Sequence, residues 1–417
     1  MASTGQSCMY LPSYPSEANA NRAVGILRSR VANHAEEEKL FLSVLLSSQA
    51  GGLELARNLK GSIQQRLNLL DISNVRFPRV ASLVYRYFAV KVRQAERLRS
   101  VSRSIKERLS SAMLSCFAGS PKPTRSYYSR VDAVNAKVNR LEAEYYDNIA
   151  LWAETEILTS SFATKRLGEL ATRIKDGPGG WGVSTNDYVG SGVPVIRGVN
   201  IVDGDCDLRD CVFISPEKHC ELQGHRATKG SVVLSVRGTI GRSAVFDLPG
   251  IDEASLNAAV VTIDCGNEIE PHYLAEFFNS DIGHIQTRRI ANGAVQQNMN
   301  LTETQSNLIV VPPMEFQLNI ARRRKFGINL GRISRQLVDS AKLLVESLIE
   351  RQVTEDELIH AQTRLEQGDQ SADRAILSRL YEGGWDADHT RPLFPDLDAY
   401  YETLRMVERE SAEAPEK

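Results

Sequence analysis

A nine-residue stretch occurs twice in this chain, as GSIQQRLNL at 61–69 and as GAVQQNMNL at 293–301, 232 positions apart. The same offset, which pairs Gly61 with Gly293 at the start of the two stretches, also aligns three preceding pairs: Ser48/Ser280, Gly51/Gly283 and Leu53/Ile285. After one inserted residue, SNVRFP at 73–78 aligns with SNLIVVP at 306–312. Because chance similarity rarely keeps glycine, Gln-Gln and asparagine in register, we interpret the pair as a duplicated structural unit. The fold must therefore build the same local structure twice.

The second copy shows the order of elements within one unit. HYLAEFFNSDIGHIQTRRI at 272–290 has apolar residues three and four apart, which predicts a short helix. Gly293 begins a turn, and the β-branched run NLIVV at 307–311 predicts a buried strand that the following prolines end.

A long helix is predicted after each copy. The apolar residues that support these helices are three or four apart: Leu98, Val101, Ile105, Leu109 and Met113 after the first copy, and Leu330, Ile333, Leu337, Ala341, Leu344 and Leu348 after the second. A third segment, beyond the GSPKPT break, has heptad spacing at Val131, Val134, Val138, Leu141 and Tyr145. Since apolar seams need partners, we expect an antiparallel coiled coil; an ordinary helical bundle is the alternative.

Residues 165–312 have the sequence pattern of short strands rather than that of long helices. SGVPVIRGVNI, KGSVVLSVRGTIGRSAVF and LNAAVVTI are β-rich runs separated by glycine, aspartate and proline. Several short strands with turn signals between them predict a compact mixed domain of about 150 residues. The predicted fold class is therefore α+β, with a mixed α/β domain attached to long antiparallel coiled-coil helices.

Charge is distributed unevenly along the 417 residues, although the net charge is only −2. Residues 76–130 hold 13 Lys/Arg against 2 Asp/Glu, whereas residues 350–417 hold 8 against 17. Such asymmetry indicates a chain that meets a polyanion at one place and solvent or a partner at another. The basic stretch is interpreted either as a solvated helix face or as a basic rod that contacts DNA or a partner protein.

Six cysteines are too few for a disulfide scaffold, which favours a reducing, cytoplasmic location. Cys206, Cys211, His219 and Cys220 are clustered, but their C-x4-C-x7-H-C spacing fits structural zinc sites poorly. We therefore expect small buried thiols and no metal site. No secretory signal is visible, and no apolar run approaches the ~20 residues that a membrane span needs.

An ordered set of motifs resembles the DNA specificity (S) subunit of type I restriction-modification systems. KRLGEL (165–170) is similar to the opening strand of its target-recognition domain, and VPVIRGVNI (193–201) to its Gly-Ile-Pro…Arg…Asn-Ile stretch. KGSVVLSVRGTIGRSAVF (229–246) resembles its Gly-Asp…Ser…Gly-Thr-Ile-Gly segment, and LNAAVV (256–261) its Leu-Asn, although Ala258 stands where glutamine is frequent. The Gly-x-x-Gln turn, SNLIVVPP and a long distal helix complete the order from 165 to about 350.

The resemblance implies an alternation of recognition domain and long helix, which explains the repeat. On that basis residues 1–78 are the remnant of a truncated first target-recognition domain and 79–164 are the central long helices. Residues 165–313 are the complete recognition domain, 314–367 the distal long helix, and 368–417 an acidic, partly disordered C-terminal tail. The first unit lacks a portion equivalent to 165–260, which leaves recognition of two half-sites in doubt.

DNA reading needs cations for phosphates and polar side chains for base edges. The candidate DNA-binding residues flank glycines or turns in the resembling motifs: Arg197, Asn200, Lys229, Arg237, Thr239, Arg242, Gln296, Gln297 and Asn298. Two alternatives stay open, because Gln297 and Asn300 recur in both copies and can instead fix the turn, and Arg197 can form a structural ion pair.

No catalytic motif is present: the sequence has no Asn-Pro-Pro-Tyr, no Gly-x4-Gly-Lys-Ser/Thr, no Gly-x-Ser-x-Gly and no His-Glu-x-x-His. We therefore expect a non-catalytic subunit without a cofactor of its own. The resemblance implies double-stranded DNA as ligand and, as partners, adenine-N6 methyltransferase (modification) subunits that bind S-adenosylmethionine. A restriction/translocase subunit can join them in phage defence. The alternative is a coiled-coil adaptor in a defence complex that has lost DNA reading.

Overall fold

The computed structural model describes residues 19, 24–27, 35–61, 67–76, 78–124, 143–179, 182–293, 297–386 and 390–413. Its contacts divide the chain into two units, one of Met1–Ser102 with Asn329–Lys417 and one of Arg103–Ile328. Two long helices, α4 (Ser82–Leu114) and α11 (Met314–Ile349), contribute to both. No helix among the described residues is long and apolar enough to cross a membrane.

The second unit is a mixed domain built on two sheets. One sheet has the order β10-β9-β12-β2, from Ser243–Val245, Val232–Ser235, Val260–Cys265 and Ala171–Asp176, and all its neighbours are antiparallel. The other has the order β3-β7-β4-β11-β8, from Tyr188–Val189, Val212–Ile214, Val193–Ile196, Glu253–Leu256 and Arg226–Thr228. Within it, β11 pairs in parallel with β4 and antiparallel with β8.

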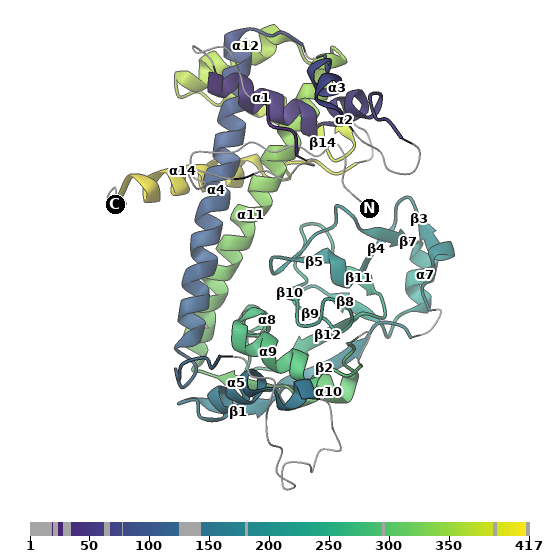
Figure 1. The fold of residues 1–417 in the computed structure, drawn as a ribbon, viewed down its shortest axis with the longest axis vertical. Helices are drawn as coiled ribbons and strands as arrows, with labels where there is room; N and C mark the ends of the chain where they lie inside the picture. The colour runs from purple at the N-terminus through teal and green to yellow at the C-terminus, as the bar shows by residue number, and fades with distance from the viewer. Residues whose placement is uncertain are drawn as a thin grey trace. The chain divides into compact units, whose positions relative to one another are not determined.

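Most of the four-stranded sheet is buried on both faces. Strands β9 and β10 and the first four residues of β12 are buried throughout, whereas the edge strand β2 mixes half-buried and exposed residues. Along β9, Val232 and Leu234 enter a core shared with α8 (Pro271–Asn279) and α9 (Asp281–Ile290), whereas Val233 enters a second core with Ile196 and Leu256 of the other sheet. The alternation follows from the two-residue period of a strand. Figure 1 shows α8 and α9 beside β9 and β10.

Smaller elements close this unit. A hairpin of β5 (Ile201–Val202) and β6 (Asp205–Cys206) and the pair β1 (Ala163–Arg166) and β13 (Leu308–Val311) are both antiparallel. Helices α5 (Asn148–Leu158), α6 (Leu167–Leu170), α7 (Pro216–Glu221) and α10 (Leu301–Ser306) and 3-10 turns at Ala143–Tyr146, Thr185–Asp187 and Gly198–Asn200 complete it.

The first unit is mostly helical. It contains α1 (Ala35–Ser47), α2 (Gln49–Ala56), α3 (Leu69–Ser73), α12 (Glu355–Glu366), α13 (Ser371–Leu377) and α14 (Leu397–Glu413). Its described strands are the short hairpin of β14 (Leu380–Tyr381) and β15 (Gly384–Trp385). The described parts of the C-terminal tail, 368–386 and 390–413, contain these regular elements. Helix α14 extends through Glu413 because Tyr400, Tyr401, Leu404 and Val407 give it one buried face.

The predicted fold class is confirmed, including the antiparallel pairing of the long helices (Figure 1). In the first unit Ser334 Oγ of α11 donates a hydrogen bond to the Ala95 carbonyl of α4 at 2.8 Å. In the second unit a Cβ added at Gly327 of α11 would stand 3.2 Å from Ile105 of α4. The heptad seam predicted at Val131–Leu141 lies outside the described residues.

The described residues of the two copies, which leave out 62–66 and 294–296, have the same local structure. Ser48 and Ser280 each begin a helix, α2 or α9, by accepting a hydrogen bond from the amide of Gly51 or Gly283 at 3.2 Å. A Cβ at either glycine would lie 2.0 Å from a carbonyl oxygen of the preceding helix, so both positions require glycine. This confirms the alignment of the duplicated unit.

The described residues that follow in each copy also adopt matching conformations and caps. Gly61 and Gly293 both have positive φ, of 100° and 104°. Asn68 and Asn300 then begin α3 and α10 with capping boxes closed by Asp71 and Glu303. Lys60 binds Asp71 at 2.9 Å, and its counterpart Asn292 donates to Glu303.

The copies differ in how their apolar faces are covered. Ile285 and Leu301 of the second copy pack against the main core of their unit. Their counterparts Leu53 and Leu69 are 60% and 76% exposed. The elements that contact α10 in the second unit include α6 and β2, which precede it in the chain.

Two local predictions were wrong. The segment 272–290 is two helices rather than one, because Ser280 caps a new helix at that point. KRLGEL was expected to be a strand, but β1 ends at Arg166 and Leu167–Leu170 form a helical turn. Leu167 and Leu170, three residues apart, are both buried, which is the helical spacing.

Candidate nucleic-acid interface

The turn that links β9 to β10, residues 236–242, is the best-supported candidate for DNA contact. Gly238 and Gly241 both have positive φ, of 71° and 89°, which glycine adopts readily. The Thr239 amide donates to the Arg237 carbonyl at 2.8 Å, and the Gly241 amide to the Ser235 carbonyl at 2.9 Å. Ser235 Oγ lies 2.9 Å from Thr239 Oγ1. The backbone of the turn is therefore fixed from within.

Two distant segments hold this turn from outside. Gly198 lies so close that an added Cβ would stand 2.7 Å from Ser235 Oγ and 2.9 Å from Thr239 Oγ1. On another side, the Met299 amide donates to the Val236 carbonyl at 3.0 Å, and Arg237 and Asn298 form an isolated antiparallel bridge. The fold thus gathers candidates that the sequence separates by about a hundred positions.

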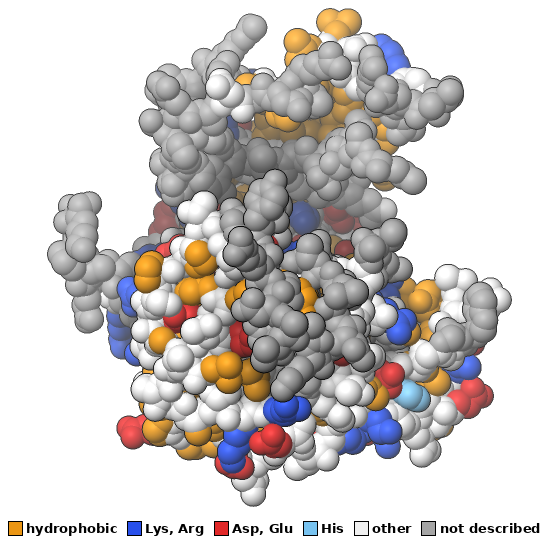
Figure 2. All heavy atoms as spheres, turned by 60° about the horizontal axis from the view of Figure 1, so that its bottom comes forward, with side chains coloured by type: hydrophobic (Ala, Val, Ile, Leu, Met, Phe, Trp, Pro, Cys, Tyr) orange, Lys and Arg blue, Asp and Glu red, His pale blue; other side chains and the backbone are white. Residues whose placement is uncertain are grey.

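Arg237 and Arg242 present free cations at this site. Both side chains are exposed, and neither forms an ion pair with another residue that the structure describes. A guanidinium can donate two parallel hydrogen bonds to guanine or bind a phosphate. On the face drawn in Figure 2, basic and acidic side chains are interspersed, so positive charge is available locally and not as one continuous field.

Three candidates have a structural role instead. Asn200 is 2% exposed; its Oδ1 accepts from the Arg197 amide at 3.1 Å and its Nδ2 donates to the Asp207 carbonyl at 3.1 Å. The half-buried Arg197 guanidinium donates to Asn200 and to the Asp210 carbonyl. Thr239 is half-buried against Ser235. These contacts position the turns, so a base contact from any of the three would compete with a hydrogen bond inside the chain; their DNA-binding role stays a prediction.

The remaining candidates are separated or undetermined. Lys229 precedes β9, whereas residues 236–242 follow it, so the two lie beyond opposite ends of that strand. Its Nζ lies 3.8 Å from Asp247. Asn298 and Gln297 are half-buried at the bridge, and Gln296 lies outside the described residues.

Sequence reasoning missed three residues beside the turn. Val199 of the Gly198–Asn200 turn is 58% exposed, and His284 and Arg288 lie on α9, where His284 contacts Gly241. The i,i+4 spacing of His284 and Arg288 was visible in the sequence, but their approach to residues 236–242 depends on tertiary packing.

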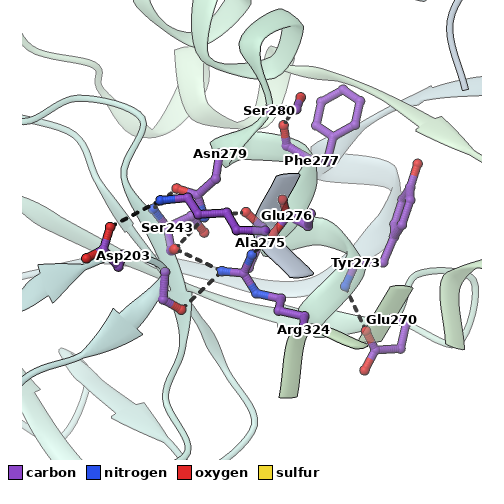
Figure 3. A network of polar contacts seen from close by, with 12 residues as sticks. Asp203, Ser243, Glu270, Tyr273, Ala275, Glu276, Phe277, Asn279, Ser280 and Arg324 are labelled. Atoms are coloured by element: carbon purple, nitrogen blue, oxygen red, sulfur yellow. Dashed lines mark hydrogen bonds and ion pairs between the residues drawn. The ribbon is translucent and has the colours of Figure 1, made fainter. Parts of the chain in front are cut away.

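A buried ion pair anchors this region to α11. The Arg324 guanidinium, 5% exposed, binds the Glu276 carboxylate of α8 and donates to the carbonyl of Gly204 at 3.1 Å and of Ser243 at 3.4 Å (Figure 3). Gly204 belongs to the β5–β6 turn, which directly follows the Gly198–Asn200 turn. Since a buried charge without partners is costly, this set of contacts fixes α8, the hairpin and β10 to one helix.

Three cations of the basic stretch 76–130 form ion pairs with acidic residues elsewhere in the first unit. Arg86 binds Glu366 at 2.9 Å, Lys91 binds Asp373 at 2.5 Å, and Arg93 binds Glu36 at 3.0 Å. These three cations, of the 13 in the stretch, are therefore not available to a basic surface that would contact DNA or a partner protein. In the second unit Arg103 and Arg108 of α4 are exposed without an ion pair among the described residues.

No metal centre is evident in the part of the chain that the structure describes, because no three histidine, cysteine or acidic side chains come together there. His219 Nδ1 lies 2.7 Å from Ser255 Oγ, and its Nε2 lies 3.3 Å from Glu253. Cys206 is buried and Cys220 is exposed.

No family model matches the chain, and no curated protein matches it significantly. Among solved structures it is similar to the HsdS subunit from Thermoanaerobacter tengcongensis, with 17% identity over 80% of this chain and 70% of that one and a TM-score of 0.30. It is also similar to the type I restriction-modification S subunit from M. genitalium, with 15% identity over 78% and 73% and a TM-score of 0.36. A chain described under complex assembly and conformational transition of the type I R-M system has 17% identity over 79% and 72% and a TM-score of 0.35. These values are too low to assign a family, so the function is argued from the chain's own motifs and geometry.

Proposed function

We propose that this chain is the sequence-specific DNA recognition subunit of a type I restriction-modification complex. It has no catalytic role and no cofactor of its own, and it directs a partner methyltransferase to adenine N6. That partner binds S-adenosylmethionine, and a restriction/translocase subunit joins the same assembly in the cytoplasm. Support comes from the ordered motifs between residues 165 and 350 and from the duplicated unit with its long antiparallel helices.

The observation that carries the proposal is the internally hydrogen-bonded turn 236–242, whose two arginines have no ion pair with any residue that the structure describes. The backbone that carries a base-reading group should be fixed before DNA arrives, because ordering a mobile loop on binding costs affinity. Here the backbone of Arg237 is fixed by Thr239, by Asn298 and by the adjacent Gly198 turn. Its guanidinium is left free to donate to guanine.

Neighbouring side chains add other kinds of base contact to this surface. The half-buried Asn298 carries an amide of the kind that pairs with adenine, and the exposed Val199 offers methyl groups of the kind that contact thymine. A surface that combines guanidinium, amide and methyl groups can distinguish bases, whereas lysines alone would bind any duplex.

The direct test is to co-express the chain with an adenine-N6 methyltransferase from the same locus and to map methylated adenines. We expect co-purification and one methylated motif, which changes when residues 163–313 are replaced by the equivalent domain of a related subunit. Arg237→Gln should relax or abolish the motif, while Lys175→Gln, which removes an exposed lysine of β2 without a described ion pair, should leave it intact. A motif unaffected by the domain exchange would refute the proposal.

A coiled-coil adaptor that has lost DNA reading is the second candidate. It is favoured by the first unit, whose repeat is present as α1–α3 while Arg86, Lys91 and Arg93 of the basic α4 pair with acidic residues of the same unit. It predicts that the full chain, with or without the methyltransferase, binds no duplex at any salt concentration.

A further inference from the structure

We propose that Arg242, His284 and Arg288 form a contact site for a DNA backbone phosphate, beside the base-reading turn, and that His284 takes up a proton when the phosphate binds. The inference rests on the proposed function and adds to it a residue set on α9 that no motif indicated. It concerns where the duplex is held, not which bases are read.

The geometry begins with the packing of α9 on the turn. His284 and Arg288 are one helical turn apart and therefore lie on the same face of α9. The imidazole lies against Gly241, where a Cβ would stand 2.6 Å from His284 Nδ1. Gly241 has a φ of 89° and directly precedes Arg242, so the turn delivers an arginine next to the α9 face.

The charges at this point are mostly positive. Arg242 and Arg288 are exposed, and neither forms an ion pair within the described ranges. Asp281, one turn before His284 on the same face, is the opposing acidic group, and Lys122 lies 3.5 Å from its carboxylate. A phosphate would meet two uncompensated guanidinium groups here, which is the arrangement that phosphate recognition favours.

These neighbours affect the pKa of His284. Burial is the main cause that lowers its pKa below the usual value, and the positive charges of Arg288 and Arg242 lower it further, while Asp281 acts in the opposite direction. A bound phosphate would bring negative charge to the same place and favour the imidazolium form. Binding and proton uptake are therefore coupled, so affinity rises as the pH falls.

Such a site has a defined use next to base-reading groups. Phosphate contacts carry no sequence information, but they set the register and orientation of the protein on the duplex. Because α9 and the turn 236–242 touch at Gly241, a phosphate held by α9 fixes the distance from the backbone to Arg237.

The experiment measures duplex binding by the full chain, using one duplex with the methylated motif and one with a scrambled motif, across about 50–200 mM salt. Arg288→Gln should reduce the slope of log affinity against log salt by ~0.9, the value for one lost phosphate contact, and should weaken both duplexes equally. The matched control is Arg322→Gln, which removes an exposed arginine of α11 and should change neither quantity.

The second measurement is the pH dependence between about pH 5.5 and 7.5, around the ordinary titration range of histidine. Wild type should bind more tightly as the pH falls, with at most a tenfold gain per pH unit for one proton, and His284→Gln should lose this gain. If wild type discriminates the motif but Arg288→Gln and His284→Gln behave like Arg322→Gln, this inference is overturned and the proposed function survives. Loss of the motif duplex alone in Arg288→Gln would make it a base contact and also overturn the inference. If wild type binds neither duplex, the proposed function itself fails.

Discussion

The ion pair between Lys91 and Asp373 allows a sharp test of how the C-terminal segment is held on α4. Both side chains are 1% exposed, and Nζ lies 2.5 Å from the carboxylate. The hydroxyls of Tyr87 and Tyr401 also donate to Asp373, each at 2.5 Å. Because water does not reach this site, Lys91→Met leaves a buried carboxylate with neutral donors only.

The expected cost follows from that burial. Removing one partner of a buried ion pair costs about 3–5 kcal/mol of unfolding free energy. At about 2–4 °C per kcal/mol for a domain of this size class, the thermal midpoint should fall by about 6–20 °C. The control is Arg93→Met, which breaks an exposed pair with Glu36 and should cost less than ~1 kcal/mol. Thermal unfolding followed by far-UV circular dichroism measures both.

The double variant Lys91→Met/Asp373→Asn identifies the cause of the loss. It removes both charges. The asparagine oxygen still accepts from one of the two tyrosine hydroxyls, which donate to different oxygens of Asp373, and the amide nitrogen can donate to the other. The double variant should therefore be more stable than Lys91→Met alone. If Lys91→Met shifts the midpoint no more than Arg93→Met does, or if the two substitutions are additive, the buried charges do not secure the tail.

Three further outcomes are expected. Leu69→Gln should change the unfolding free energy by less than ~0.5 kcal/mol, because Leu69 is 76% exposed. Leu301→Gln, at the equivalent position that packs against the core, should cost about 1–3 kcal/mol in urea titrations. Equal costs would contradict the comparison of the two copies. Arg237→Gln should cost about 1–3 kcal/mol of discrimination between cognate and altered duplexes in competition binding, and an unchanged preference would exclude it as a reading group. Burial, and then the nearby Asp373, raise the pKa values of Tyr87 and Tyr401 above those of the unfolded chain. The contribution of these tyrosines to stability is therefore complete below about pH 10 and is lost as the pH rises further. A thermal midpoint that stays constant up to about pH 11 would argue against this.

The fold was predictable where the structure depends on neighbouring residues. The repeat identified Ser280 and Gly283 as equivalents of Ser48 and Gly51, and all four take part in the same cap. The helix break at Ser280 was nevertheless missed, because apolar periodicity continues across it. KRLGEL was misassigned because family resemblance suggested a strand where Leu167 and Leu170 are buried with helical spacing.

The candidate site was predictable only in part, for a related reason. Arg237 and Arg242 were found through their adjacent glycines, which mark a turn in any context. Asn200 looks equally polar in sequence, but its amide is used by Asp207 and Arg197, and that depends on the hairpin that follows. The distribution of charge along the sequence was the poorest guide to a binding surface, because the counter-ion of Lys91 is Asp373, 282 positions away.

The capped block that occurs twice is self-contained, because its hydrogen bonds close over a few residues: Ser280 to Gly283, and Asn300 to Glu303. Such a block can be joined by recombination to a different strand framework without losing any of these bonds. Exchange of the preceding segment would then alter the surface offered to a ligand while the junction with the long helix keeps its shape. Evolution of a chain built this way can proceed by replacing whole modules rather than by accumulating single substitutions.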